Sequence, residues 1–78
     1  MGETVTVKTV NGKTHKINFT DQTTVSRLKE EVAQKEGIKV NEVVLVYSGK
    51  PLENGNHTLE EAGIETNATI FLVYRLQG

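Results

Sequence analysis

The sequence predicts an α+β fold in which a mixed sheet is covered on one face by one main helix. Three observations lead to this prediction: strand-period alternation over residues 4–8 and 17–19, helix-period apolar residues over 25–36, and two apolar runs over 43–47 and 69–76. The order of two strands, a helix, a strand, a short element and a last strand leaves a single helix to cover the sheet. We expect residues 1–78 to form one domain, since 78 residues supply one small core and no more.

The chain up to residue 20 predicts a β-hairpin. Polar and apolar residues alternate over residues 4–8, and the apolar alternation resumes over 17–19. Between these segments, Asn11-Gly12 is a pair that tolerates positive φ and is typical of a hairpin turn. Val10 is out of phase with the alternation that precedes it. We therefore expect Val10 to lie in the loop with its side chain exposed.

The segment after the hairpin predicts an amphipathic helix. Thr24 is suited to the N-cap position, where a side-chain oxygen accepts from a free backbone N–H. Val25, Leu28 and Val32 follow at the spacing i, i+3 and i+7, which places them on one face. Gly37 supplies the left-handed residue that commonly ends a helix. One side of this helix is expected to meet the core and the other side water.

The second half of the chain predicts two further strands with an irregular stretch between them. Residues 43–47 form an apolar strand bounded by a turn over 48–51, and residues 69–76 form the last strand. Residues 52–59 are rich in asparagine and glycine. For that stretch we expect irregular structure with one short strand or helical turn.

The two later predicted strands carry apolar residues on both of their faces. Folding alone requires them on only one face. A sheet with one helix buries one face, so its strands should alternate apolar and polar residues. If residues 45, 70 and 72 face the helix, then Val44, Val46, Phe71 and Val73 face outward. Four outward apolar residues on neighbouring strands predict a contiguous surface patch, with Val10 nearby if its loop folds back. Such patches on small proteins usually mark a binding surface.

The composition excludes several classes of chemistry. The chain has no cysteine, so it has no disulfide, no cysteine nucleophile and no cysteine-ligated metal. Its two histidines, His15 and His57, are expected at the surface; they are too few for a metal site and form no evident catalytic pair. We therefore expect no enzyme activity, no cofactor and no metal.

Charge and hydropathy limit the partners in the same way. A net charge of −1 gives no reason to expect nucleic acid or a membrane as a partner. No apolar stretch is long enough to cross a bilayer, and the first residues lack the features of a secretory signal. A monomer in the cytoplasm and nucleus is the expectation.

Several segments resemble the ubiquitin family, in the same order and at nearly the same spacing from end to end. They are "VKTVNGKT" (Val7 to Thr14), "QKEGI" (Gln34 to Ile38), "LVYSGKPLENG" (Leu45 to Gly55), "TL" (Thr58-Leu59) and "FLVYRLQG" (Phe71 to Gly78). The resemblance covers the whole chain, apart from two extra residues at the start and one near His57. It implies the β-grasp fold, in agreement with the order of elements above.

The resemblance also implies a binding patch. Val46 lies where the family has the central isoleucine of its patch, and Val10 and Val73 lie where it has a loop leucine and a strand valine. Phe71 replaces a histidine at the patch edge, which makes this surface more apolar. The implied partners are ubiquitin-binding helices or domains.

The end of the chain resembles the family's conjugation tail, here Arg75, Leu76, Gln77 and Gly78. The resemblance implies attachment of that tail to target lysines by activating, conjugating and ligating enzymes, and removal by deconjugating proteases. Glycine suits such a tail because it has no side chain to obstruct a narrow enzyme channel. Lysines at family chain-linkage positions are Lys50, Lys13, Lys8, Lys29 and Lys35. Two other linkage positions are lost, to Glu31 and Thr66.

The tail departs from the family pattern in having one glycine, Gly78, where the family's active form ends in two. Val44, Asn56 and Gln77 also replace family arginines, whereas Arg75 is kept. Three explanations fit: the sequence stops before a final glycine, the chain is one domain of a tandem protein, or the protein binds without being conjugated. The segments "GKPLE" and "ATIFLVYRL" also resemble the interferon-induced tandem ubiquitin-like modifiers. The alternative to a modifier is therefore a non-conjugated interaction domain of a larger or tandem protein.

Overall fold

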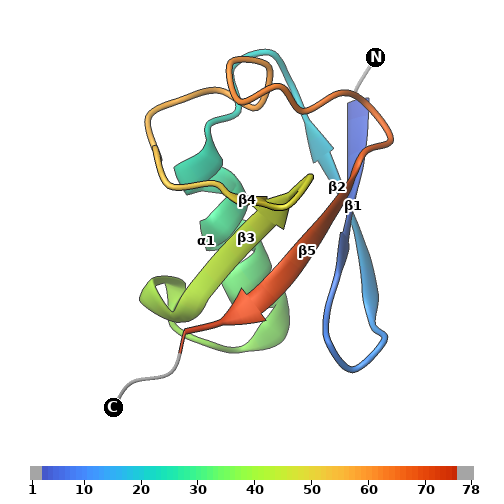
Figure 1. Ribbon diagram of the computed structural model, residues 1–78, viewed down its shortest axis with the longest axis vertical. Helices are drawn as coiled ribbons and strands as arrows, with labels where there is room; N and C mark the ends of the chain where they lie inside the picture. The colour runs from blue at the N-terminus through green and yellow to red at the C-terminus, as the bar shows by residue number, and fades with distance from the viewer. Residues whose placement is uncertain (1–2, 76–78) are drawn as a thin grey trace.

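A computed structural model describes residues 3–75 and contains five strands and one long helix (Figure 1). The elements are β1 (Glu3–Lys8), β2 (Thr14–Phe19), α1 (Val25–Glu36), a short 3-10 helix η1 (Val40–Glu42), β3 (Val43–Tyr47), β4 (Lys50–Pro51) and β5 (Thr69–Tyr74). Within residues 3–75, α1 and η1 are both too short and too polar to cross a membrane.

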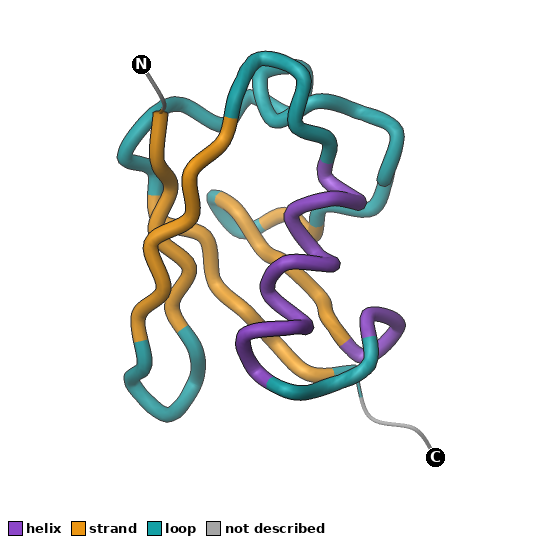
Figure 2. The backbone as a smooth tube through the Cα atoms, turned by 180° about the vertical axis from the view of Figure 1, so that it is seen from behind, coloured by secondary structure: helices purple, strands orange, loops and turns teal. Residues whose placement is uncertain are grey.

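The sheet is mixed, with the strand order β2-β1-β5-β3-β4. β1 and β5, the first and last strands, pair in parallel at its centre, and every other pair is antiparallel. Helix α1 crosses one face of the sheet (Figure 2). The predicted α+β class, the mixed sheet and the single covering helix are therefore confirmed.

Helix α1 begins and ends where the sequence predicts. The Thr24 hydroxyl oxygen accepts from the backbone N–H of Arg27 at 3.2 Å. Gly37 has a φ of 69°, in the left-handed region, and its N–H donates to the Gln34 carbonyl. The buried residues of the helix are Val25, Leu28, Val32 and Ala33. The predicted apolar face is thus confirmed, with one alanine added to it.

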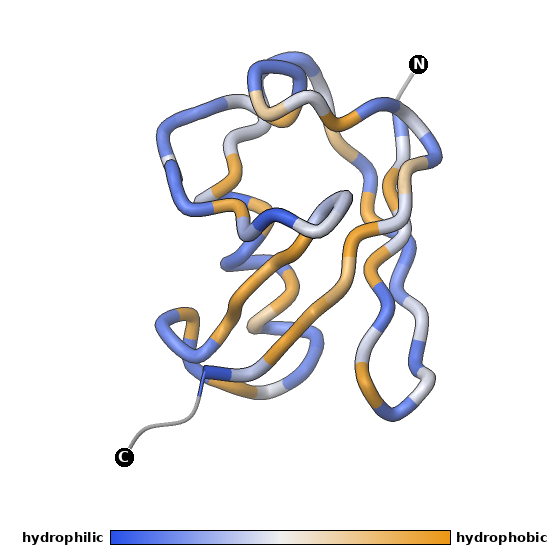
Figure 3. The backbone as a smooth tube through the Cα atoms, viewed as in Figure 1, coloured by the Kyte–Doolittle hydropathy of each residue, from blue (hydrophilic) through white to orange (hydrophobic). Residues whose placement is uncertain are grey.

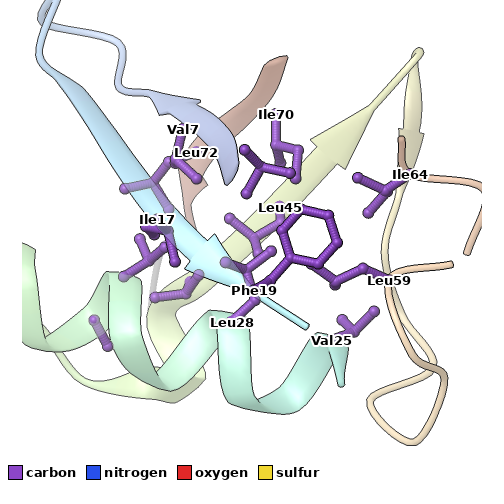
Figure 4. Close-up of a cluster of buried hydrophobic side chains, with 14 residues drawn as sticks. Val7, Ile17, Phe19, Val25, Leu28, Leu45, Leu59, Ile64, Ile70 and Leu72 are labelled. Carbon is purple, nitrogen blue, oxygen red and sulfur yellow. The ribbon is translucent and has the colours of Figure 1, made fainter. Parts of the chain in front are cut away.

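The core lies between α1 and the sheet (Figure 4). Four strands, β1, β2, β3 and β5, contribute alternate residues to it, so each of them carries one buried face. The largest fully buried side chains are Ile17, Leu28, Leu45, Leu59, Ile70, Leu72, Val5, Val7, Val25 and Val32. Most of these come from the sheet and the helix, while Leu59 comes from the irregular stretch, which closes one end of the core.

The stretch after β3 differs from the prediction in one respect. The short strand is at Lys50–Pro51, inside the predicted turn, and not within residues 52–59. Ser48 and Gly49 both have positive φ, of 54° and 80°. Two successive residues of this kind form a tight hairpin turn, so the chain reverses at once and pairs with β3.

The irregular loop is anchored to the start of the helix. The N–H groups of Val25 and Ser26 donate to the carbonyls of His57 and Gly55, at 2.8 and 3.1 Å. The first N–H groups of a helix have no partner within the helix. Loop carbonyls therefore satisfy donors that would otherwise need water, and the loop is held against the helix as a result.

Candidate functional site

An apolar patch lies on the face of the sheet opposite the helix. Its members are Val44, Val46, Phe71 and Val73, hereafter the outer-face patch. Val46 lies opposite Phe71 and Val44 opposite Val73 in the antiparallel pairing of β3 with β5. Phe71 is 51% exposed and Val73 41% exposed, and the two valines of β3 are half-buried. Figure 3 shows the two strands as adjacent apolar segments.

The register extends this surface across four strands. Lys8 of β1 lies beside Phe71, and Pro51 of β4 lies opposite Val46. One row therefore runs from Lys8 through Phe71 and Val46 to Pro51. Pro51 was not singled out from the sequence, because its membership depends on the tight turn before β4. A flat apolar strip with a lysine at one end suits an amphipathic helix or strand from another protein.

Val10 lies outside the strands that carry the outer-face patch. It is 76% exposed in the loop between β1 and β2, as the alternation predicts. The parallel pairing of β1 with β5 ends at Lys8 and Phe71, two residues before Val10 and Val73. Strand pairing thus brings together Val46, Phe71 and Val73, and the fourth predicted patch residue, Val10, lies in the β1–β2 loop.

The base of the tail lies where β5 ends. The strand was predicted to continue to residue 76, but it ends at Tyr74. Arg75 follows with an exposed side chain, and its backbone N–H donates to the Glu42 carbonyl at 2.8 Å. This bond continues the register of β3 with β5 by one residue beyond Tyr74, because Val43 pairs with Tyr74. The other predicted tail residues, Leu76, Gln77 and Gly78, lie outside the described residues.

Three side chains meet beneath the base of the tail, on the helix side of the sheet. The imidazole Nε2 of His15 lies 2.5 Å from the Glu36 Oε2, and the Tyr74 hydroxyl donates to the Glu36 Oε1 at 2.7 Å. The Glu36 side chain is only 4% exposed. Hydrogen bonds from His15 and then Tyr74 hold the pKa of the Glu36 carboxyl below its usual value. The hydrogen bond to Glu36 raises the pKa of Tyr74.

The prediction that His15 is a solvated surface residue is therefore wrong. His15 has the same phase in β2 as the buried Ile17 and Phe19, so it faces the helix, and its side chain is 20% exposed. The alternation of β2 contained this signal. Its partner could not be read from the sequence, because Glu36 is 21 residues away and the two meet only when the helix crosses the sheet. His57 is exposed in the loop, as predicted, and its ring bonds to the Asn54 amide.

The five candidate linkage lysines are spread over the molecule. Four of them have exposed side chains: Lys8, Lys13, Lys35 and Lys50. Lys29 is half-buried on the helix. Lys50 lies in β4 directly after the tight turn, on the strand that also places Pro51 at the end of the patch row. Among residues 3–75, histidine and acidic side chains form no group of three that could hold a metal ion.

The fold and the outer-face patch define a class of protein: a small β-grasp module with one helix behind the sheet and a bare apolar face in front. Family comparison identifies the class more closely. A model described as "Ubiquitin family" matches residues 5–77, which is nearly the whole chain. The chain belongs to the ubiquitin family.

Individual relatives fall into two kinds by length. The chain is 34% identical over 74 residues to ubiquitin-like protein 1 of Schizosaccharomyces pombe, covering 95% of this chain and 94% of that protein. It is 37% identical over 71 residues to ubiquilin-4 of Mus musculus and 35% identical over 71 residues to ubiquilin-4 of Homo sapiens. Each ubiquilin match covers 91% of this chain but 12% of the longer protein. Similar sequences therefore occur both as a short protein and as a small part of a long one.

Proposed function

We propose that this protein is a ubiquitin-like modifier, attached through its C-terminal tail to lysines of target proteins and recognised through the outer-face patch. One observation carries the proposal: β5 holds both parts. Phe71 and Val73 present their side chains from this strand, and the tail base at Arg75 follows directly after it. In this proposal the protein acts in the cytoplasm and nucleus, and its partners include activating, conjugating and ligating enzymes and deconjugating proteases.

The outer-face patch supports the proposed recognition by partners because its apolar surface has a higher free energy in water than when a partner covers it. Apolar surface gains about 25 cal/mol for each Å² removed from water. Val46, Phe71 and Val73 lie on the face that the helix does not cover. A partner helix laid across them would recover that free energy. A relative of nearly equal length, ubiquitin-like protein 1 of Schizosaccharomyces pombe, supports this proposal.

A second candidate function is a non-covalent interaction domain within a longer protein. The specific observation in its favour is the match to ubiquilin-4, in which the similar segment is 12% of the length. The same outer-face patch would serve both functions. The two candidates differ in whether the tail is ever activated, so the experiment must test the tail.

The experiment compares the chain as given with a variant that carries one glycine added after Gly78. Each protein is incubated with ATP and a panel of activating enzymes of the ubiquitin family, and a thiol-sensitive adduct is sought on a non-reducing gel. We expect an adduct from the extended variant, because a terminal diglycine removes side chains from the site of attack. The given chain, with a glutamine before its glycine, serves as the matched control.

The outcomes separate the two candidates. An adduct from the extended variant, with or without one from the given chain, supports the modifier, and the enzyme that is charged identifies the pathway. If neither version forms an adduct with any enzyme of the panel, the modifier proposal is wrong. The interaction domain is then the better account of the patch.

A further inference from the structure

We propose that Asn54 is a site of spontaneous deamidation, at which the folded loop between β4 and β5 favours conversion of the side-chain amide to a carboxylate. The sequence contains two Asn-Gly pairs, Asn11-Gly12 and Asn54-Gly55. Glycine after asparagine favours this reaction because it has no side chain to obstruct the approach of its nitrogen. Both asparagines are exposed, so water reaches both. The hydrogen bonds around the two pairs, and not their exposure, therefore decide which one converts.

The reaction consumes water and needs no cofactor. The Gly55 backbone nitrogen attacks the Asn54 Cγ, a bond forms between these two atoms, and the bond from Cγ to Nδ2 breaks. The amide nitrogen leaves as ammonia with the proton that the Gly55 nitrogen loses, and a succinimide ring remains. Water then opens the ring at either of its carbonyls and returns a proton to the nitrogen. The product is aspartate, or isoaspartate with its methylene inserted in the backbone.

The attacking nitrogen is available at only one of the two pairs. The Gly12 N–H donates to the Thr9 carbonyl at 3.1 Å, so this bond must break before the nitrogen can attack Asn11. At the other pair, the Asn54 carbonyl accepts from the His57 N–H at 3.2 Å, which closes a turn over residues 54–57. Such a turn does not use the N–H of its second residue. Among residues 3–75 the Gly55 N–H has no hydrogen-bonded acceptor.

The Asn54 side chain is held near the atom that attacks it. Its Oδ1 accepts from the Asn56 N–H at 3.0 Å. The ring of atoms closed by this bond contains both the Asn54 Cγ and the Gly55 nitrogen, so the side chain curls back over that nitrogen. Negative charge develops on Oδ1 during the attack, and a backbone N–H aimed at such an oxygen lowers the barrier. The Asn11 Oδ1 also has a donor, the Thr9 hydroxyl, so the two pairs differ chiefly in the attacking nitrogen.

His57 fixes the orientation of the Asn54 amide. The Asn54 Nδ2 lies 3.2 Å from the His57 Nε2. An amide nitrogen only donates hydrogen bonds, so the ring nitrogen is the acceptor. The opposite orientation of the amide would set its nitrogen against the Asn56 N–H, with two donors facing each other. The Asn54 oxygen is therefore kept at the N–H that stabilises the developing charge.

Conversion changes how the loop supports helix α1. The Gly55 and His57 carbonyls accept from the first N–H groups of the helix, those of Ser26 at 3.1 Å and Val25 at 2.8 Å. Isoaspartate lengthens the backbone directly before Gly55, which displaces the Gly55 carbonyl from its donor. Both products add a negative charge to the surface pocket that this side chain shares with Lys50. Isoaspartate thus loosens a helix contact, and either product changes the charge beside a lysine.

The experiment follows both asparagines of the full chain near neutral pH by peptide mass spectrometry, with fragmentation that locates the change and separates aspartate from isoaspartate. We expect Asn54 to convert about fivefold to tenfold faster than Asn11, the factor given by one hydrogen bond on the Gly12 nitrogen and none on the Gly55 nitrogen. Asn54→Gln should give no product at this position, because its carbonyl carbon lies one bond further from the nitrogen.

The same chain in guanidinium chloride is the matched control. Both pairs lose their turns there, so the two rates should become similar. Equal rates in the folded chain, or a faster rate at Asn11, would overturn the proposal. A ratio in guanidinium chloride as large as in the folded chain would also overturn it, since the neighbouring residues and not the folded loop would then be the cause.

The effect on the helix is measured on the isoaspartate protein, separated from the unconverted protein by chromatography. Hydrogen exchange at the Ser26 amide should show about fivefold less protection, the factor expected for the loss of one hydrogen bond. The core Leu45 amide should keep its protection. Unchanged protection of Ser26 would show that conversion does not loosen α1. The reaction requires no conjugating enzyme, so these results hold whether or not the protein is a modifier.

Discussion

Phe71 shows how a large apolar side chain can lie outside the core of a small protein. It is 51% exposed at the centre of the sheet, between Lys8 of β1 and Val46 of β3. Its side chain faces away from the core, which the neighbouring Ile70 and Leu72 join. The family position holds a histidine, so phenylalanine makes the outer-face patch more apolar. Aromatic residues in such positions often carry much of the binding energy of an interface.

Phe71→Ala is expected to weaken binding of an amphipathic ubiquitin-binding helix about tenfold, which corresponds to about 1.4 kcal/mol. The free energy of unfolding should fall by no more than about 1 kcal/mol, the value of a cross-strand pair. Calorimetric titration and urea unfolding measure the two quantities. Asn18→Ala, on an exposed position of the edge strand β2, is the matched control and should bind normally. Equal affinities for Phe71→Ala and the wild type would remove Phe71 from the binding surface.

At the scale of the element, the contact between the helix start and the irregular loop depends on a glycine. A Cβ at Gly55 would lie 2.7 Å from the Ser26 hydroxyl oxygen. The carbonyl of the same glycine accepts from the Ser26 N–H at 3.1 Å. The loop therefore approaches the helix as closely as a residue without a side chain allows.

Gly55→Ala is expected to destabilise the protein by about 1 kcal/mol, at the low end of overpacking costs because the serine hydroxyl can rotate away. Ser26→Ala removes that oxygen, so adding it to Gly55→Ala should restore part of the loss. Urea unfolding of the two single variants and the double variant gives the coupling free energy. Additive effects, with no coupling between positions 26 and 55, would show that the cost has another source.

Local sequence patterns predicted a helix or strand well where a single spacing of apolar residues determined its type and its buried face. The helix bounds follow from Thr24 and Gly37, and the outward direction of Val46, Phe71 and Val73 follows from the phase of β3 and β5. Features that depend on three-dimensional register could not be predicted in this way. The pair of Tyr74 with Glu36 joins residues 38 positions apart, and the pair of His15 with Glu36 joins residues 21 positions apart.

At the scale of the whole molecule, the Glu36 and Tyr74 ionisations set limits on stability at both ends of the pH range. The folded-state pKa of Glu36 is lowered, so its carboxylate contributes stability above about pH 5 and loses it as the pH falls through the folded-state pKa. The folded-state pKa of Tyr74 is raised, so its hydroxyl contributes stability below about pH 10 and loses it as the pH rises through the folded-state pKa. Stability should therefore be highest between these limits.

Glu36→Gln is expected to lower the free energy of unfolding at pH 7 by about 1–3 kcal/mol, since hydrogen bonds to a charged group are lost. It should also flatten the fall in stability on the acid side. Tyr74→Phe should flatten the fall on the alkaline side. Urea unfolding from pH 3 to pH 11 measures the fall in stability at both the acid and the alkaline end. If the free energy of unfolding falls as steeply at low pH in Glu36→Gln as in the wild type, other carboxylates cause the acid sensitivity.

The parallel pairing of β1 with β5 has a consequence for how the protein is made. Ribosomes release a chain from its N-terminus at about 5–20 residues per second, so β1 emerges first and its central neighbour last. Thr6 pairs with Thr69, and Val7 with Ile70, so the middle of the sheet cannot close until the chain has been synthesised through β5. Until then the hairpin, the helix and β3 lack the strand that joins them. A translation product that stops before β5 would leave β1 and β3 as open edges, available to pair with other chains.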